Sequence, residues 1–115
     1  MRRGDVFLVN LDPSLGAESR KIRPAILVSN DAANTAASRN ARGVVTVVPI
    51  TSNTNRVYPF QVRLGSGEAG LDRESKAQAE QVRSIDVGRL TRRLGTLGPT
   101  TLRELDEALR LHLAL

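Results

Sequence analysis

The chain has 115 residues, with 17 Lys and Arg against 12 Asp and Glu, and carries a formal net charge of +5. We expect residues 1–115 to form one domain, because this length supports a single core. The absence of cysteine excludes disulfides, thiol catalysis and thiolate metal sites, and the single histidine excludes both a multi-histidine zinc site and a two-histidine ribonuclease mechanism.

No apolar stretch approaches the ~20 residues that a membrane-spanning helix needs. The N-terminus leads directly into a strand-like pattern and shows no apolar segment of a signal peptide. We therefore expect a cytoplasmic protein that does not associate with membranes.

Strand signals dominate the first part of the chain. Residues 5–11 are β-prone and end at an Asp-Pro turn signal, and the polar segment 12–22 is typical of a long loop. Residues 24–29 predict a second strand, whose first residue is a proline. The Ala-rich segment 30–37 starts with an asparagine, a preferred N-cap residue, and predicts a short helix.

The middle of the chain predicts two more strands. Residues 43–48 are β-branched nearly throughout, as expected for a strand buried on both faces, and we expect this strand to stop at Pro49. The hydroxyl- and amide-rich segment 50–56 predicts a loop. Residues 60–64 alternate apolar and polar, which predicts a half-buried strand followed by a glycine-rich hairpin region.

The last third predicts two strands and a helix. Residues 76–85 keep a period of two, and residues 92–97 form the last predicted strand. After a Gly-Pro pair, residues 101–104 match a capping box at the start of a C-terminal helix. The resulting fold class is mainly β with α: a small, curved, antiparallel sheet or open barrel with a C-terminal helix.

The leucines of the C-terminal helix fall on two faces. The stripe that would face the core consists of Leu102, Leu105, Leu109 and Leu113. Leu111 and Leu115 lie on the opposite side and predict a contact within a homodimer, with frayed terminal leucines as the alternative.

The positive charge is carried almost entirely by arginine, which supplies 15 of the 17 cations. A permanently charged guanidinium fork suits phosphate, so this surplus predicts a polyanionic partner such as nucleic acid. The excess is +4 in residues 1–60 and +1 in residues 61–115. The only aromatic residues, Phe7, Tyr58 and Phe60, are too few for an extended base-stacking platform.

Four strings follow one another along the chain: RGDVF at 3–7, KIRPAILV at 21–28, VPITS at 48–52 and EQVRSID at 80–86. In this order and spacing they resemble the MazF/PemK/Kid family, the toxin components of bacterial type II toxin–antitoxin modules. The resemblance covers essentially all 115 residues.

The resemblance implies an SH3-like (CcdB/PemK-like) barrel and a metal-independent endoribonuclease that needs no cofactor. Such a toxin cuts single-stranded RNA at a short specific sequence by attack of the 2′-hydroxyl, leaves a 2′,3′-cyclic phosphate and a 5′-hydroxyl, and inhibits translation and growth. The resemblance also implies a homodimer with RNA across its interface, a cognate MazE-like antitoxin that blocks the groove, and contact with DNA only indirectly through the antitoxin complex.

Two residues correspond to the catalytic pair of the family. Arg23 stands in the Arg-Pro motif and Thr51 in the Ile-Thr motif. Guanidinium donors and a hydroxyl suit the clamping of a phosphate and the stabilisation of the charge that develops in the transition state. The alternatives are a surface arginine in a loop and a turn hydroxyl bound to its own backbone.

The general base is a separate question, since arginine does not readily give up its proton. Glu18 and Glu80 are the carboxylates nearest to the motif strings, and each is a candidate base or orienting group. Some relatives carry a second arginine two residues before the acidic position of the last string, where this chain has Gln78, and others carry a loop histidine that this chain lacks. Arg23 must therefore carry more of the electrostatic stabilisation.

Base recognition is expected from the loop 12–22, the segment 53–60 and the Glu80-Gln81 edge. The residues that we expect to contact RNA are Arg3, Ala17, Ser19, Arg20, Lys21, Ser52, Asn53, Arg56, Tyr58, Pro59, Gln78 and Gln81. Phe60 either stacks with a base or belongs to the core, because it alternates with Val62. No metal ligand and no chemistry for His112 are expected.

Two rival functions stay open at this point. One is a CcdB-like gyrase-binding toxin without catalysis, although such proteins use a Trp-containing C-terminus for their target and this chain has no Trp. The other is a non-catalytic RNA-binding barrel, which the pair Arg23 and Thr51 makes a weaker interpretation.

Overall fold

The structure, a computed structural model, describes residues 1–11 and 22–115. The strands are β1 (Asp5–Asn10), β2 (Ile22–Leu27), β3 (Val44–Thr51), β4 (Gln61–Leu64), β5 (Ser75–Gln78), β6 (Arg83–Asp86) and β7 (Leu90–Thr96). The helices are α1 (Asp31–Asn40) and α2 (Pro99–Leu113), with single 3₁₀ turns η1 (Glu68–Gly70), η2 (Ala79–Gln81) and η3 (Val87–Arg89). No helix in these ranges is long and apolar enough to cross a membrane.

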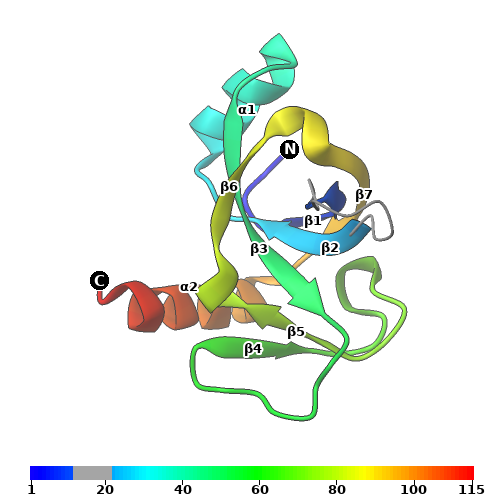
Figure 1. Cartoon of the computed structure of the whole chain (residues 1–115), viewed down its shortest axis with the longest axis vertical. Coiled ribbons are helices and arrows are strands. Elements are labelled where there is room, and N and C mark those ends of the chain that lie inside the picture. Colours follow the sequence, from blue (N-terminus) through cyan, green and yellow to red (C-terminus); the bar gives the residue numbers. More distant parts are fainter. Residues whose placement is uncertain (12–21) are drawn as a thin grey trace, which may run out of the picture.

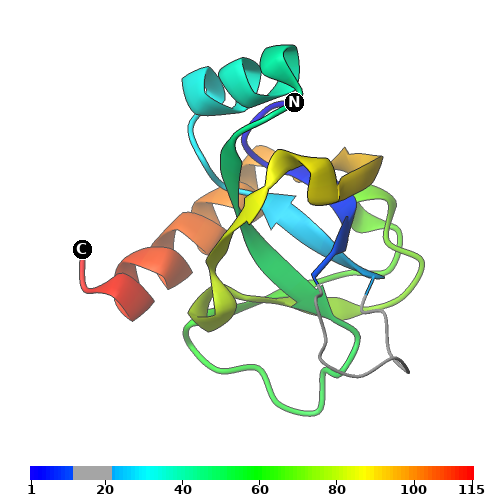
Figure 2. The ribbon, with the colours of Figure 1, turned by 45° about the horizontal axis from the view of Figure 1, so that its top comes forward.

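The strands form one curved antiparallel sheet in the order β4-β5-β3-β2-β1-β7, with β6 paired to β3. The α2 helix lies alongside β4 and η2 at one end of the sheet (Figure 1). The α1 helix projects away from the body of the sheet (Figure 2). The predicted fold class is confirmed.

Strand β3 is the centre of the sheet, and the prediction that it stops at Pro49 is wrong. One edge of β3 pairs with β2 over Val47–Pro49. The other edge pairs with β6 over 44–47 and with β5 over 50–51, so Pro49 lies between two neighbours on that edge. The missing N–H of a proline is least costly at such an interruption of the ladder. Thr51 therefore ends a strand, where a loop was expected.

The predicted strand 76–85 is two strands separated by a turn. Both β5 and β6 pair with β3, but at positions on either side of the interruption, and η2 makes the step between them. Period-two patterning cannot show such a break, because the residues on both sides keep the same alternation.

The start of α2 also differs from the prediction. The helix begins at Pro99 with Gly98 as N-cap. Proline is favourable at this first position because an N–H there would have no partner within the helix. Thr101 lies inside the first turn, and its hydroxyl donates to Oε2 of Glu68 at 2.6 Å, so the expected capping box is wrong.

The apolar stripe of α2 enters the core only in part. Leu105 and Leu109 are buried and Leu102 packs against the core from its edge. Leu113 is 48% exposed because the last turn of α2 extends past the strands that it packs against (Figure 1). The α1 helix matches its prediction at the start, where the side chain of Asn30 accepts the N–H of Ala33, and it continues to Asn40.

A close contact between two backbones fixes the segment after η1. Gly70 has a φ of +79°, and a Cβ there would lie 2.2 Å from the carbonyl oxygen of Leu94 in β7. Across the contact, a Cβ on Gly95 would lie 2.6 Å from the carbonyl carbon of Ala69. Only glycine allows this approach at both positions, and the contact holds η1 against β7.

Asp5 ties β1 to β7 from a buried position, where it is 4% exposed. Its carboxylate accepts hydrogen bonds from the hydroxyl of Thr96 at 2.5 Å and the backbone N–H of Arg2 at 2.9 Å, and pairs with Nε of Arg93 at 3.4 Å. Burial is the largest single influence on the pKa of Asp5 and would raise it, but the hydrogen bonds and the guanidinium together lower the pKa.

We expect Asp5→Asn to lower the free energy of unfolding at pH 7 by about 1–3 kcal/mol, because the charge-assisted hydrogen bonds are lost. The pKa of Asp5 is lowered in the folded state, so its contribution is present above the unfolded value of about 3.9 and is lost as the pH falls below it. Urea unfolding between pH 3 and 7 checks this. The variant should lose less stability than the wild type on acidification, and equal pH dependence of the two proteins would contradict the assignment.

Candidate functional site

Arg23 and Thr51, chosen from separate motifs, line one cleft of about 390 Å³. Residues from β1, β2, the end of β3 and the segment after η1 form its walls. They are Leu8, Arg23, Pro24, Ile50, Thr51, Ser52, Leu71, Asp72, Arg73 and Ser75. The sheet order explains the meeting, because β2 and β5 pair with adjacent stretches of β3, over 47–49 and 50–51, on its opposite edges.

Arg23 is the second residue of β2, opposite Val9 of β1. It is half-buried and forms no ion pair with a described residue. Since β2 starts at Ile22, two residues earlier than predicted, the strand backbone holds Arg23. A guanidinium on a strand and without a carboxylate partner is available to an anion in the cleft.

Thr51 closes β3, opposite Lys76 of β5. Its Oγ1 accepts the backbone N–H of Asn53 at 3.3 Å, and the side chain of Asn53 in turn accepts the N–H of Asn55 at 3.2 Å. The turn interaction expected as the alternative for Thr51 is thus present. It occupies one acceptor position of the hydroxyl, which leaves the hydroxyl proton able to point at a ligand oxygen.

The segment after β3 forms an aromatic and cationic cluster. The rings of Tyr58 and Phe60 are stacked, with centroids 5.3 Å apart and an interplanar angle of 2°, and the His112 ring of α2 lies 6.4 Å from Phe60. The guanidinium of Arg56 and the amine of Lys76 lie 5.5 and 6.0 Å from the centre of the Tyr58 ring. Phe60 is half-buried and is not a core residue, because its ring packs on Tyr58.

Glu80 is bound by a neighbour and does not line the cleft. Its Oε2 accepts the amide of the buried Gln61 at 2.7 Å, and Oε1 is enclosed with no hydrogen-bond partner among the described residues. The carbonyl of the same Gln61 side chain accepts the N–H of Tyr58 at 3.1 Å. Gln61 therefore couples the aromatic segment to η2.

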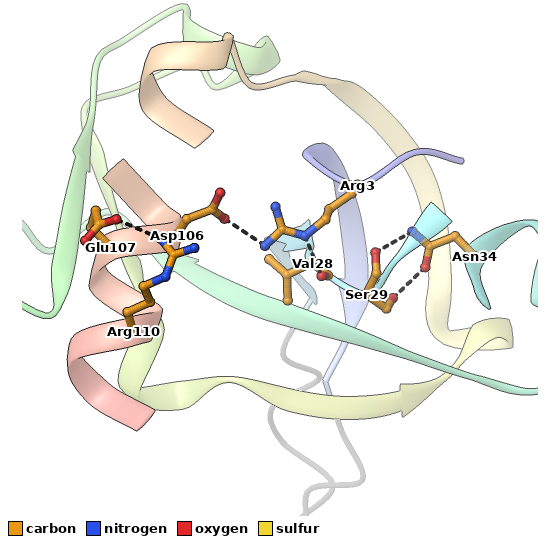
Figure 3. Close-up of polar contacts among 7 residues, drawn as sticks. All are labelled: Arg3, Val28, Ser29, Asn34, Asp106, Glu107 and Arg110. Atoms are coloured by element: carbon orange, nitrogen blue, oxygen red, sulfur yellow. Dashed lines mark hydrogen bonds and ion pairs between the residues drawn. The ribbon is translucent and has the colours of Figure 1, made fainter. Parts of the chain in front are cut away.

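Arg3 lies in a structural network (Figure 3). Its Nε donates to the carbonyl of Val28 and its Nη2 to Asp106 of α2, each at 2.8 Å, and its backbone N–H donates to Asp31. The guanidinium thereby joins the N-terminus to the end of β2 and to α2.

The other expected contact residues are spread over three parts of the chain. Ser52 lines the cleft; Asn53, Arg56, Tyr58 and Pro59 are exposed on the following segment; Gln78 ends β5 and Gln81 ends η2. The predicted residues outside the described ranges are Ala17, Glu18, Ser19, Arg20 and Lys21.

Sequence reasoning missed Asp72 and Arg73, which line the cleft. The signal that marks them is a pair of adjacent opposite charges immediately after the glycine-rich turn, in a segment assigned only to a hairpin. No group of three or more His, Asp or Glu side chains in residues 1–11 and 22–115 is arranged to hold a metal ion.

The comparisons with known proteins decide the family. The model of the PemK-like, MazF-like toxins of type II toxin–antitoxin systems matches residues 2–113. The chain belongs to this family. It is 55% identical to the endoribonuclease MazF9 of Mycobacterium tuberculosis, over 100% of this chain and 98% of that protein. It is 34% identical to the endoribonuclease MazF of Staphylococcus saprophyticus, over 100% of this chain and 92% of that protein.

Solved structures of MazF proteins share the fold. MazF from Deinococcus radiodurans superposes with a TM-score of 0.76 at 27% identity, over 100% of this chain and 97% of that chain. A MazE–MazF structure from the same organism gives a TM-score of 0.77 at 27% identity, over 100% of this chain and 96% of that chain. With its full-length similarity to MazF endoribonucleases, this chain is an endoribonuclease toxin.

We expect Gln61→Met to destabilise the fold by about 1–3 kcal/mol, because Glu80, whose Oε1 is already enclosed without a partner, loses the one donor that the structure shows for its carboxylate. Removing both partners is cheaper than leaving one unpaired, so Gln61→Met/Glu80→Met should be more stable than Gln61→Met. Urea unfolding at pH 7 measures both. A double variant less stable than the single one would show that the two residues do not act as a pair.

Proposed function

We propose that this toxin cleaves single-stranded RNA at a short specific sequence in the cleft that contains Arg23 and Thr51. The 2′-hydroxyl attacks the adjacent phosphorus, and the products are a 2′,3′-cyclic phosphate and a 5′-hydroxyl. The observation that carries the proposal is the meeting in one cleft of an oriented hydroxyl and a guanidinium that has no carboxylate partner among the described residues.

In this reaction the O2′–P bond forms and the P–O5′ bond breaks, while the proton of O2′ passes to the general base and water supplies the proton that reaches O5′. Arg23 binds the non-bridging oxygens as their charge rises, and the Thr51 hydroxyl donates to the same phosphate. Of the two candidate bases, Glu80 is occupied by Gln61, so we assign the base to Glu18. Asp72 is the one carboxylate that the described part of the cleft wall contains.

The RNA strand flanking the scissile phosphate is assigned to the exposed segment after Thr51. Arg56 supplies charge, and the Tyr58 ring, 41% exposed, supplies a face for a base at the edge of the stack. Ser52, Asn53, Pro59, Gln78 and Gln81 complete the set. Arg3 is left out of the contact set, because its guanidinium is bound to Asp106 and Val28.

We further propose a homodimer that is neutralised by a MazE-like antitoxin and that meets DNA only through the antitoxin complex. The MazE–MazF structure of the related toxin supports the antitoxin. Three leucines near the end of α2 support the dimer: Leu111, Leu113 and Leu115 are 58%, 48% and 84% exposed. Two of them border an apolar groove of about 430 Å³ together with Val28 and Val82.

Incubation of the purified protein with a long RNA in EDTA tests the reaction. We expect cleavage at discrete sites with 5′-hydroxyl ends. Arg23→Ala and Thr51→Val should each lower kcat/KM by at least about a hundredfold, because a donor to the developing charge is lost. Gln78→Ala is the matched control from the neighbouring strand, where a milder effect is expected. Intact RNA would contradict the reaction, and wild-type activity of both cleft variants would contradict the site.

The dimer is tested with Leu113→Glu. A charge on an exposed apolar residue should not unfold the monomer but should shift the mass measured by light scattering from dimer to monomer. Ala36→Glu places the same charge on the exposed face of α1 and should leave the mass unchanged. A dimeric Leu113→Glu protein would place the interface elsewhere.

A further inference from the structure

A second guanidinium lines the cleft of Arg23 and Thr51. Arg73 follows η1, and with Leu71 and Asp72 it forms the part of the wall contributed by the segment before β5. Because Gln78 stands where some relatives have a second arginine, Arg23 is the one arginine that the motifs assign to the charge of the phosphate. Arg73 brings a second cation to the cleft from a different position in the chain.

The backbone of Arg73 is held on both sides although its side chain is 72% exposed. On one side Leu71 is buried in the core, directly after the glycine contact between η1 and β7. On the other side the hydroxyl of the buried Ser75 donates to the carbonyl of Arg73 at 3.0 Å. The cation therefore stands on a positioned backbone at the cleft.

Arginines on β4, β7 and α2 form closer ion pairs with carboxylates. Arg63 pairs with Glu74, Arg93 with Asp5, and Arg110 with Glu107. The contact of Arg73 is weaker: its Nε lies 3.8 Å from the carboxylate of Asp72, which is 92% exposed. Exposed pairs of this kind contribute little, so an entering phosphate can displace the carboxylate from Arg73.

We propose that Arg73 binds a backbone phosphate of the RNA next to the scissile one, so that the strand is held by Arg73 and Arg23 at two successive phosphates. This rests on the proposed cleavage in the same cleft. Asp72 opposes the approach of the RNA, because its negative charge borders the same space. Arg73 thus sets the affinity and the register of the RNA strand, while Arg23 and Thr51 bind the phosphate that reacts.

The test uses an oligonucleotide that carries a mapped cleavage site with a 2′-deoxy sugar at the attacking nucleotide, so that binding is measured without cleavage. Arg73→Ala should weaken binding about five- to tenfold at 0.1 M salt and reduce the slope of log K against log salt by about 0.7, the value for one phosphate contact on a single strand. With the cleavable RNA, KM should rise and kcat should stay close to wild type.

Two variants give matched comparisons. Arg39→Ala removes the same charge from the exposed last turn of α1, outside the cleft, and should change affinity far less. Asp72→Asn removes the opposing charge and should tighten binding, the opposite sign to Arg73→Ala. If Arg73→Ala and Arg39→Ala weaken binding equally, Arg73 acts only through the net charge of the protein and the proposal is overturned.

Replacing single linkages by uncharged methylphosphonates locates the contact. In the wild type, one linkage beside the cleavage site should weaken binding when neutralised, and Arg73→Ala should abolish the sensitivity at that linkage alone. Unchanged sensitivity would overturn the proposal. If Arg23→Ala remains fully active, the proposed cleavage site itself fails. If Arg23→Ala is inactive while Arg73→Ala behaves as wild type, only the role of Arg73 fails.

Discussion

The structure depends on one constraint: the backbone of strand β3 must pair with different strands along its length. It pairs with β2 on one edge, and with β6 and then β5 on the other, with the change of partner beside Pro49. Because β3 is shared in this way, β2 and β5 pair with adjacent stretches of it on opposite edges of the curved sheet (Figure 1). The cleft follows directly, because Thr51 lies where β3 ends and Arg23 lies near the start of the strand beside it.

The cleft needs a fixed wall as well as a strand end, and the fixed wall comes from the approach of η1 to β7. Two glycines allow two backbones to meet there, and the contact anchors the segment that carries Asp72 and Arg73. The β7 strand is itself held to β1 through Asp5. The order of this outer wall therefore depends on a buried carboxylate at the beginning of the chain that does not itself line the cleft.

Short-range sequence patterns predicted most helices and strands, but they did not predict where β3 ends or where residues 76–85 divide into two strands. The cap at Asn30 and the alternation around Val62 depend on neighbours in sequence, so the helix and the strand were predictable. The continuation of β3 through Pro49 and the division of residues 76–85 depend on which strands lie beside them, and periodicity carries no such information. Arg23 and Thr51 were predictable from motifs; Arg73 belongs to no motif and reaches the cleft only through the contact between η1 and β7.

The arginines of the cleft differ in their pairing from those that hold the N-terminal region to α2 and β7. Arg3 pairs with Asp106 of α2, and Arg93 of β7 pairs with Asp5 of β1. The charges of these two arginines are therefore partly neutralised by contacts that join the N-terminal region to α2 and β7. Arg23 has no carboxylate partner in the described structure, and Arg73 has only a long, exposed one. Arg23 and Arg73 are the two cations of the described cleft wall, and neither charge is neutralised by a close ion pair with a described residue.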